Sequence, residues 1–576
     1  MMSPRWQIRR RPVPEDRCAR LPDSLHPVLR RVYAARGIGP GELDLSLGGL
    51  LPVGGLAAAL RAAELLAGAI ERGERILVLG DYDADGATAT ALLISSLRAL
   101  GHDNCAYLVP DRFRYGYGLS PEIAALAARG APDWLLTVDN GISSVAGVAR
   151  ARSLGMRVIV TDHHLPGERL PEADAIVNPN LPDEPFAGKS LAGVGVAFYL
   201  LAALLRTLRE RGRLTAAEER RIVNEGLDLV ALGTVADLVP LDHNNRILVA
   251  AGLRRMRAGR LRPGLRALFA VAGREPARAA AADLGYAIAP RLNAAGRLTD
   301  MSLGIDCLLT SDPDRARRLA GRLDALNRER RRLQAEMEAE AGRQLDAAAA
   351  QLVADDTLGH CLFDPGWHEG VVGLLASRVK ERTGRPVVAF ARADDPQLLK
   401  GSARSVDGVH MRDLLDRVAV RHPGLLLRFG GHAMAAGLSL RAADLARFRA
   451  AFEAELAQHA DALAGPGLLL SDGGLPADQL GPALAQTLAD AGPWGQGCPA
   501  PLFDDRFEAL EQRLLQARHL KLRLRHADGG EPVDAIAFGQ SRLPGGGPLR
   551  ICYRLELNHY RGRAEAQLVV EHMQSD

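Results

Sequence analysis

Short apolar runs alternate with helical patterns through the first half of the chain. The candidate buried strands are RILVLG at Arg75–Gly80, WLLTV at Trp134–Val138, RVIV at Arg157–Val160 and a short run at Ala175–Val177. Stretches with apolar residues three and four apart separate them, such as ATATALLISSLRAL. Strands that alternate with helices predict a parallel sheet covered on both faces. We therefore expect an α/β fold for this region.

A long helix is predicted where the pattern changes, near residue 311. Ser311-Asp312-Pro313 offers a cap and a proline at the first helical position. Apolar residues then follow three- and four-residue steps with few breakers: Leu319, Leu323, Leu326, Leu333, Met337 and Leu345. We expect one helix over 311–354 that joins two domains and keeps its Arg/Glu-rich face in water.

The remaining chain predicts two further domains. Residues 355–463 again mix helices and strands, as in GVVGLLASRVKERTG followed by PVVAFA, and predict a second α/β domain. After a Gly/Pro joint, AGPG, residues 464–576 carry short alternating strands such as LKLRLRH and RICYRLELNHY, which predict an OB-like β-barrel. An N-terminal extension over 1–45 and a first α/β domain over 46–310 complete the plan. The length of 576 residues agrees with roughly three or four domains of about 150 residues.

Composition and the lack of a visible targeting signal exclude several classes of protein. Lys+Arg 72 against Asp+Glu 69 leaves a net charge of +3, which by itself predicts no polyanionic partner. The six cysteines are far apart and form no CxxC pair, so a disulfide scaffold is excluded and a reduced, cytoplasmic enzyme fits. No secretory signal and no apolar stretch of about 20 residues is visible, so we expect no membrane association.

The strongest chemical motif is GDYDADG, in which Asp81, Asp83 and Asp85 follow the first strand. Three carboxylates at alternate positions can aim two at one point, which a cation makes tolerable. An EF-hand loop is the obvious rival, but its twelfth position needs Glu and is Leu92 here, and a strand enters where an EF-hand has a helix. Taken alone, the motif could be a capped turn.

Further acids and histidines stand at the ends of the next strands. Asp139 ends one strand in WLLTVDNG, and Asp162, His163 and His164 end another in RVIVTDHH. A fourth acidic site, Asp237, lies in GTVADLVPL, which we interpret as a turn rich in small residues. Each residue singly is more often a solvated loop group. Because the ends of parallel strands share one edge where α/β folds bind ligands, their joint occurrence predicts a metal centre.

Ligand type indicates the metal and the reaction. Mostly carboxylates with one or two imidazoles suit Mn²⁺ better than Zn²⁺, which prefers Cys and His, or Mg²⁺, which prefers oxygen ligands and water. Four or more carboxylates can hold two ions, and two ions about 3.5–4 Å apart clamp both oxygens of a phosphoester displacement. The sequence therefore predicts phosphoester hydrolysis.

These motifs resemble a known family. DYDADG, VDNG, TDHH and GTVADLVPL are similar to the four successive motifs of the DHH phosphoesterases, and within that superfamily to the bacterial RecJ exonucleases. GWHEGVVGLLASRVKERTGRPVV, GSARS and RFGGHAMAAGLSL resemble their DHH-associated domain, and the last strands match the position of their OB-fold. The resemblance implies degradation of single-stranded DNA from the 5′ end in recombination and repair, with two Mn²⁺ ions or Mg²⁺.

The resemblance also implies a role for each site residue. Asp83 and Asp85 would be metal ligands, and Asp139 would bridge two ions. His163 and Asp237 would complete the second ion, and His164 would face the scissile phosphate. Asp81 would be either a ligand or a support of the turn, and Asp162 a partner that orients a ligand.

Substrate contacts are expected near this centre. Arg112 and Tyr115 lie in VPDRFRYGYG, and Asn293 and Arg297 in PRLNAAGRLTD, which we interpret as a buried segment where an unpaired Arg is costly without an anion. The remaining candidates come from GSARS and GGH: Ser402, Arg404 and His432. A single Arg is usually a solvated surface charge, but Arg112, Arg297 and Arg404 stand in motifs that resemble phosphate-contacting ones.

A basic strand is predicted in the last domain. Lys521, Arg523 and Arg525 alternate with leucines, and no acid lies between 512 and 528. Period two places the cations on one face, as in OB-like barrels that follow single strands. A solvated edge strand is the alternative.

The leading hypothesis is a 5′→3′ exonuclease specific for single-stranded DNA. The alternatives are a DHH phosphoesterase for short oligonucleotides or cyclic dinucleotides and a non-catalytic replication scaffold. Length and the OB-like domain count against the first, and the intact ligand positions count against the second. The resemblance also suggests a single-strand-binding protein and a RecQ-type helicase as partners, and a monomer is expected.

Overall fold

The computed structural model describes residues 6–110, 118–352, 357–393, 395–406, 408–431, 433–459, 467–545, 547–560 and 563–576. By internal contacts the chain divides into two units, one made of residues 1–11 and 329–471 and the other of residues 12–328 and 472–576. Each unit is described by itself.

The larger unit contains a five-stranded sheet in the order β3-β2-β4-β5-β6. All neighbouring strands are parallel, and their bounds are β2 Ile76–Leu79, β3 Cys105–Leu108, β4 Trp134–Val138, β5 Arg157–Thr161 and β6 Ala175–Val177. The predicted parallel sheet is confirmed. Because β3 and β4 lie on opposite sides of β2, the chain reverses its winding direction there, at the point where α/β sheets bind ligands.

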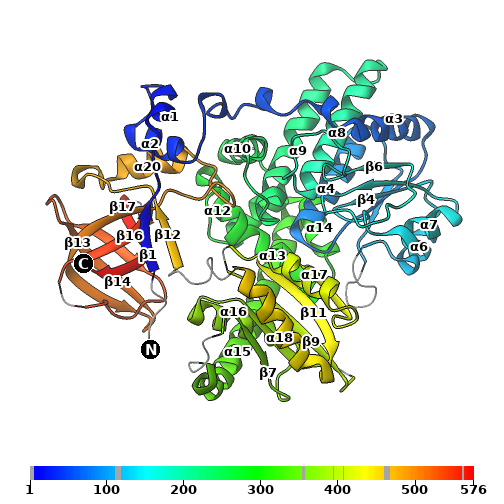
Figure 1. Ribbon diagram of the computed structural model, residues 1–576. Helices are drawn as coiled ribbons and strands as arrows, with labels where there is room; N and C mark the ends of the chain where they lie inside the picture. The colour runs from blue at the N-terminus through cyan, green and yellow to red at the C-terminus, as the bar shows by residue number, and fades with distance from the viewer. Residues whose placement is uncertain are drawn as a thin grey trace. The chain divides into compact units, whose positions relative to one another are not determined.

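Both faces of this sheet are buried, which explains its near-continuous apolar strands. Ile76, Val78 and Leu136 face one core, and Leu77 and Leu79 face the other. The helices of this region are α3 Ala57–Arg72, α4 Ala84–Ala99, α6 Pro121–Ala128, α7 Val145–Ser153, α8 Gly193–Glu210, α9 Ala216–Ala236, α10 His243–Arg257, α11 Pro263–Val271, α12 Ala281–Asp283, α13 Ala289–Leu298 and α14 Ser302–Leu309. Residues of α3, α4, α8 and α9 belong to the first core, and those of α6 and α7 to the second (Figure 1).

The long helix is also confirmed. It is α15, Pro313–Leu352, 40 residues long, and it begins at the predicted proline. No single helix in the described ranges is long and apolar enough to span a bilayer, whereas the segments Leu47–Gly55 and Ala57–Arg72 pass that test only as a pair bent by 80°.

The smaller unit contains a mixed sheet in the order β10-β11-β9-β8-β7. Its strands are β7 His360–Phe363, β8 Val387–Arg392, β9 Leu398–Arg404, β10 Arg428–Gly431 and β11 Ala435–Arg441. Residues of α16, Val372–Thr383, form one core against this sheet, and those of α17, Met411–Arg421, and α18, Leu445–Leu456, contribute to another. A separate pair of parallel strands, β1 Trp6–Arg10 and β12 Gly467–Ser471, joins the N-terminal segment to this unit.

The C-terminal region forms a closed barrel in the order β13-β14-β15-β17-β16, which confirms the OB-like prediction. Its strands are β13 Phe503–Leu515, β14 His519–His526, β15 Val533–Ala537, β16 Leu549–Tyr560 and β17 Arg563–Ser575. Three helices share the barrel's core: α1 Glu15–Arg20, α2 Pro27–Ala35 and α20 Pro482–Asp490. The domain boundaries proposed from the sequence stay predictions.

Candidate metal centre

The turn after β2 holds the first carboxylates in fixed positions. Asp83 caps α4, and its Oδ1 accepts hydrogen bonds from the backbone N–H of Asp85 at 2.9 Å and of Gly86 at 3.0 Å. This is the usual way for an aspartate to satisfy the first amides of a helix. Gly86 permits the turn, because a Cβ there would lie 2.7 Å from the Cβ of Asp81.

The Asp85 carboxylate is held by the start of a second helix. Its Oδ2 accepts from the N–H of Gly193 at 2.6 Å and its Oδ1 from that of Val194 at 2.9 Å, both in the first turn of α8. These amides are among the four that a helix leaves without an internal partner, and the helix dipole favours negative charge there. Asp85 is therefore fully buried with its orientation fixed.

Asp139 follows β4 in a strained conformation. Its φ is 61°, which is uncommon for a residue with a side chain, and the residue is 2% exposed. A Cβ on Gly193 would lie 2.6 Å from both the Cβ and the Oδ1 of Asp139. The absence of a side chain at Gly193 thus lets α8 approach this carboxylate closely.

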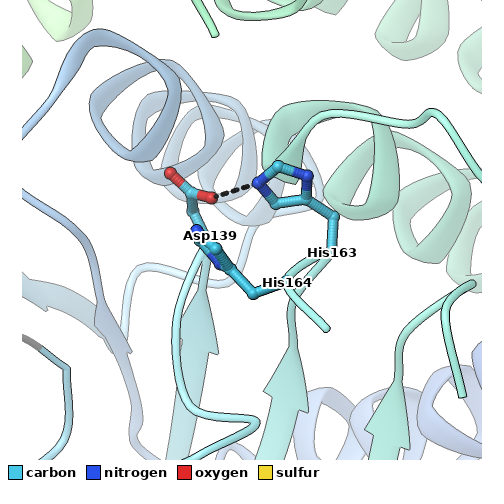
Figure 2. A group of neighbouring side chains, drawn as sticks. All are labelled: Asp139, His163 and His164. Carbon is cyan, nitrogen blue, oxygen red and sulfur yellow. Dashed lines mark ion pairs between the residues drawn. The ribbon is translucent and has the colours of Figure 1, made fainter. Parts of the chain in front are cut away.

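The two histidines follow β5 and point in different directions. The Nε2 of His163 lies 3.2 Å from Asp139 Oδ1 and 3.5 Å from Asp237 Oδ2. Figure 2 shows the His163 ring directed at the Asp139 carboxylate from the end of the neighbouring strand. The Nδ1 of His164 instead lies 2.7 Å from Asp162 Oδ1, which also accepts from the backbone N–H of His163 and His164.

Asp237 closes the site from the end of α9. It is the residue at which that helix ends, and the helix itself continues through Gly233 and Thr234. The interpretation of GTVADLVPL as a turn was therefore wrong for its first half. Gly233 lets helix α9 pack closely against Asp85, because a Cβ there would lie 2.7 Å from Asp85 Oδ1.

Three overlapping groups of side chains can each offer ligand atoms within 4.8 Å of one another: Asp139, His163 and His164; Asp85, His163 and Asp237; and Asp81, Asp83 and Asp139. The predicted metal ligands come from turns, strand ends and a helix end that are far apart in the sequence. The fold brings all of them into one cluster.

The cluster raises the pKa of most of its carboxyl groups. Burial, reinforced by the charge of Asp83, raises the pKa of Asp81 to about 7 and that of Asp85 to about 7. Burial together with Asp85 and Asp83 raises the pKa of Asp237 to about 9 and holds that of Asp139 well above its ordinary value. For Asp162, burial opposes ionisation, but the hydrogen bond with His164 lowers its pKa.

This donor set fits divalent cations. Several buried carboxylates repel one another unless a positive charge lies between them, and the raised pKa values express that repulsion. Carboxylate oxygens suit Mn²⁺ and Mg²⁺, imidazole nitrogen favours Mn²⁺ of the two, and the groups contain no thiolate.

Comparison with known proteins finds related sequences along the whole chain. The sequence matches the DHH family, N-terminal domain over residues 75–234, the DHHA1 domain over 348–458 and the RecJ OB domain over 471–572. The "Single-stranded-DNA-specific exonuclease RecJ" of Salmonella typhimurium is 50% identical over 583 residues, which cover 99% of each chain. This chain belongs to the RecJ family. The Escherichia coli protein of the same name is 50% identical over 584 residues, covering 99% of this chain and 100% of its own.

A solved RecJ structure has the same fold. RecJ in complex with Mn²⁺ from Thermus thermophilus matches with a TM-score of 0.77 and 34% identity, covering 99% of this chain and 80% of that one. The structure of RecJ with Mg²⁺ from the same organism matches with a TM-score of 0.72 and 32% identity, covering 99% and 78%.

Of the other residues predicted from the RecJ resemblance, the structure describes Asn293, Arg297, Ser402 and Arg404. The Oδ1 of Asn293 accepts a hydrogen bond from the backbone N–H of Ala84 at 2.7 Å. Asn293 therefore helps to hold the acidic turn, residues 81–86, in place. Arg297 is exposed, and the expectation of burial was wrong because Arg291 fills the interior position of α13, paired with Asp324 at 2.9 Å. Arg112, Tyr115 and His432 lie outside the described residues.

The basic strand of the RecJ OB domain is arranged as predicted, but its charge is partly balanced. Leu520, Leu522 and Leu524 are buried, and the three cations face outward. Asp534 on β15 lies 3.2 Å from Lys521 Nζ and 2.7 Å from Arg523 Nη1, and Glu508 lies 3.6 Å from Arg525. The sequence of this strand could not reveal these acids, because they come from the neighbouring strands β13 and β15.

Sequence reasoning missed the amides of α8. Gly193 and Val194 belong to LAGVGVA, in which two glycines stand in the first turn of an apolar helix. That pattern is a signal for close approach of backbone to a ligand or a neighbour, although it does not reveal which one.

Proposed function

We propose that this chain degrades single-stranded DNA from its 5′ end by metal-dependent hydrolysis of phosphodiester bonds, in DNA recombination and repair. The observation that carries the proposal is the single cluster formed by Asp85, Asp139, His163 and Asp237 in a chain of the RecJ family. Both alternatives are disfavoured, because the full-length similarity is to exonucleases and no ligand position is lost.

The residues divide the work of the reaction. Asp83, Asp85, Asp139, His163 and Asp237 would hold two Mn²⁺ or Mg²⁺ ions, and Asp81 would support the turn. When bound, such ions would polarise a phosphoryl group and activate water as the nucleophile. The amides of Gly193 and Val194 keep Asp85 oriented before any ion arrives. Little rearrangement is then needed at the moment of reaction.

His164 is positioned for a separate role. Its Nδ1 lies 2.7 Å from Asp162 Oδ1, and this contact fixes the orientation of the ring. Burial opposes a charge on the ring, but Asp162 raises the pKa of His164 overall, and a protonated ring carries a proton on Nε2 as well. We propose that this Nε2–H donates a hydrogen bond to a phosphoryl oxygen of the scissile phosphate and stabilises the charge there.

Arg404 of the smaller unit is proposed to bind a phosphate of single-stranded DNA. Its guanidinium bonds to the hydroxyls of Ser377 at 3.1 Å and Ser402 at 2.9 Å and to a backbone carbonyl, and burial lowers its pKa. Among the described residues no carboxylate pairs with it. A half-buried cation held by neutral groups is suited to an anion from outside, and Arg forms forked bonds with phosphate.

The finer parts of the proposal rest on family resemblance. A monomer, and a single-strand-binding protein and a RecQ-type helicase as partners, are proposed on that ground. A reducing compartment such as the cytoplasm is supported by the six free cysteines.

The test compares strands labelled at the 5′ or the 3′ end, single or paired, with Mn²⁺, Mg²⁺ or EDTA. We expect early release of the 5′ label from single strands only, and no release in EDTA. Asp139→Asn should reduce turnover to the EDTA level while single-strand binding persists. Asp133→Asn, at the opposite end of β4, is the matched control. Release from the 3′ end, or turnover by Asp139→Asn, would contradict the proposal.

A further inference from the structure

Three large apolar side chains stand exposed on the segments that carry the metal centre. Leu165 is 62% exposed, Leu238 is 67% exposed and Tyr286 is 80% exposed. Single exposed apolar residues are ordinary on protein surfaces. These three are unusual because each lies next to a residue or element of the site.

Leu165 and Leu238 belong to segments that meet at the centre. Leu165 comes two positions after His163, and Leu238 directly follows Asp237. The side chains of His163 and Asp237 approach to 3.5 Å. The two segments that carry these leucines therefore meet at the same cluster of ligands.

Tyr286 belongs to a third segment, which packs against the end of α9. It lies on a π-helical turn, Leu284–Ile288, that continues into α13. A Cβ on the neighbouring Gly285 would lie 3.3 Å from Val235, two residues before Asp237. Further along, Asn293 of α13 bonds to the acidic turn. Such π-turns occur frequently at functional sites.

Leu238 ends helix α9 in a left-handed conformation: it follows the C-cap Asp237, and its N–H bonds to the Val235 carbonyl at 3.4 Å, at a position that most often holds Gly. Its φ is 59°, in the left-handed region that residues other than Gly, Asn and Asp rarely adopt. An exposed leucine gains no core contact that would offset this strain. Strained residues of this kind cluster at ligand contacts and active sites.

We propose that Leu165, Leu238 and Tyr286 form an apolar rim that packs against unpaired bases of the strand whose phosphates occupy the metal centre. The inference rests on the proposed function and adds to it a basis for selecting single strands. Every base has an apolar face, so contact with the rim is independent of sequence. In a duplex those faces are stacked on neighbouring base pairs, and the rim gains nothing from them.

The test uses two fluorescent probes of equal length and charge, a dT oligonucleotide and an abasic strand, bound in EDTA so that no hydrolysis occurs. Tyr286→Ala and Leu238→Asn should each weaken binding of the dT probe by about five- to a hundredfold, the range of one stacked base. Both variants should change binding of the abasic probe little. Asn tolerates the left-handed conformation, and Tyr286→Phe, which keeps the ring, should bind dT as the parent does.

Leu154→Asn is the matched control, because Leu154 is 37% exposed and precedes β5, at the opposite edge of the sheet. It should bind both probes as the parent does. If Tyr286→Ala and Leu238→Asn keep the full preference of the parent for dT, the rim is overturned. That result is distinguishable from failure of the proposed function, in which the parent itself releases no nucleotides from single strands with Mn²⁺.

Discussion

At the scale of single residues, the missing side chain of Gly193 positions the site as much as the acids do. Gly193→Ala would place a Cβ 2.6 Å from Asp139, so either α8 or the carboxylate must move. We expect a large loss of Mn²⁺ affinity and of hydrolysis, with about 1–3 kcal/mol of destabilisation from overpacking. Mn²⁺ titration calorimetry and urea unfolding measure the two effects.

The matched control for this substitution is two residues further along α8. The nearest atoms to a Cβ on Gly195 belong to the Leu191 side chain, with Cδ2 at 3.0 Å and Cβ at 3.4 Å, and the end of that side chain can shift. Gly195→Ala should keep Mn²⁺ affinity. Parent-like affinity in both variants would show that the close approach of α8 does not position Asp139.

The raised pKa values of the carboxyl groups predict a pH dependence for metal binding. With pKa values of about 7 for Asp85 and about 9 for Asp237, the metal-free folded protein keeps protons that the unfolded chain has released above about pH 4. The folded state binds more protons, so metal-free stability should fall as pH rises from about 4 through 9. Mn²⁺ displaces those protons, and its affinity should rise over the same range.

Thermal unfolding at pH 6 and pH 8.5 tests this sign. The gain in Tm from Mn²⁺ over EDTA should be larger at pH 8.5, and calorimetry in two buffers should detect protons released on binding. An equal gain at both pH values, without proton release, would contradict the prediction.

The sequence predicted the site's acids and histidines but not what holds them. Asp139, His163 and Asp85 stand next to strand ends, and a parallel sheet brings such ends to one edge. The amide of Gly193 lies 108 positions from the carboxylate it contacts, and no local pattern joins the two. The same holds for Asn293, because its partner Ala84 is 209 positions away.

At the scale of elements, strand β14 shows what a local period can and cannot predict. The alternation of leucines and cations determined which side chains are buried, because successive residues of a strand face opposite sides. The long helix α15 was likewise predicted, since its cap and apolar spacing are local. The acids beside β14 belong to β13 and β15, and their pairing depends on register across strands.

This pairing changes the prediction for single-strand binding. Removing Lys521, Arg523 and Arg525 together should weaken binding of long strands and lower the salt slope by about 0.7 for each phosphate that these cations no longer neutralise. Asp534→Asn should do the opposite, because it releases Lys521 and Arg523 from an ion pair. Anisotropy titrations at two salt concentrations measure both.

Arg554→Ala supplies the control for this face, since Arg554 lies on β16 and pairs with Glu571 and Glu556. It should leave affinity and slope unchanged. If the triple alanine variant and Asp534→Asn also bind as the parent does, the cations of β14 form only a solvated strand face.

At the scale of the whole molecule, contacts between an N-terminal segment and the C-terminal region hold the barrel within the larger unit. Residues of α2 share a core with the barrel, and Tyr33 donates its hydroxyl to the carbonyl of Ala491 at 2.9 Å. The alternating pattern of each segment predicted its own strands and helices. It could not predict this junction, because Tyr33 and Ala491 are 458 positions apart in the sequence.

The ion pair between Arg36 and Asp472 gives this junction a measurable strength. Its atoms lie 2.8 Å apart, and the side chains are 8% and 1% exposed. Asp472 also accepts the backbone N–H of Leu502 at 3.0 Å, and the Arg36 guanidinium lies 5.3 Å from the centre of the Trp494 ring. Removing one partner of a buried pair leaves the other charge uncompensated, which typically costs about 3–5 kcal/mol.

We therefore expect Asp472→Ala to lower the free energy of unfolding by about 3–5 kcal/mol, measured by urea denaturation. Asp23→Ala is the matched control: Asp23 pairs with Arg30 at 2.9 Å, but its side chain is 96% exposed. Exposed pairs contribute at most about 1 kcal/mol, so this variant should unfold almost as the parent does. If the two variants are equally stable, the apolar core holds the barrel in place and the ion pair between Arg36 and Asp472 contributes little to stability.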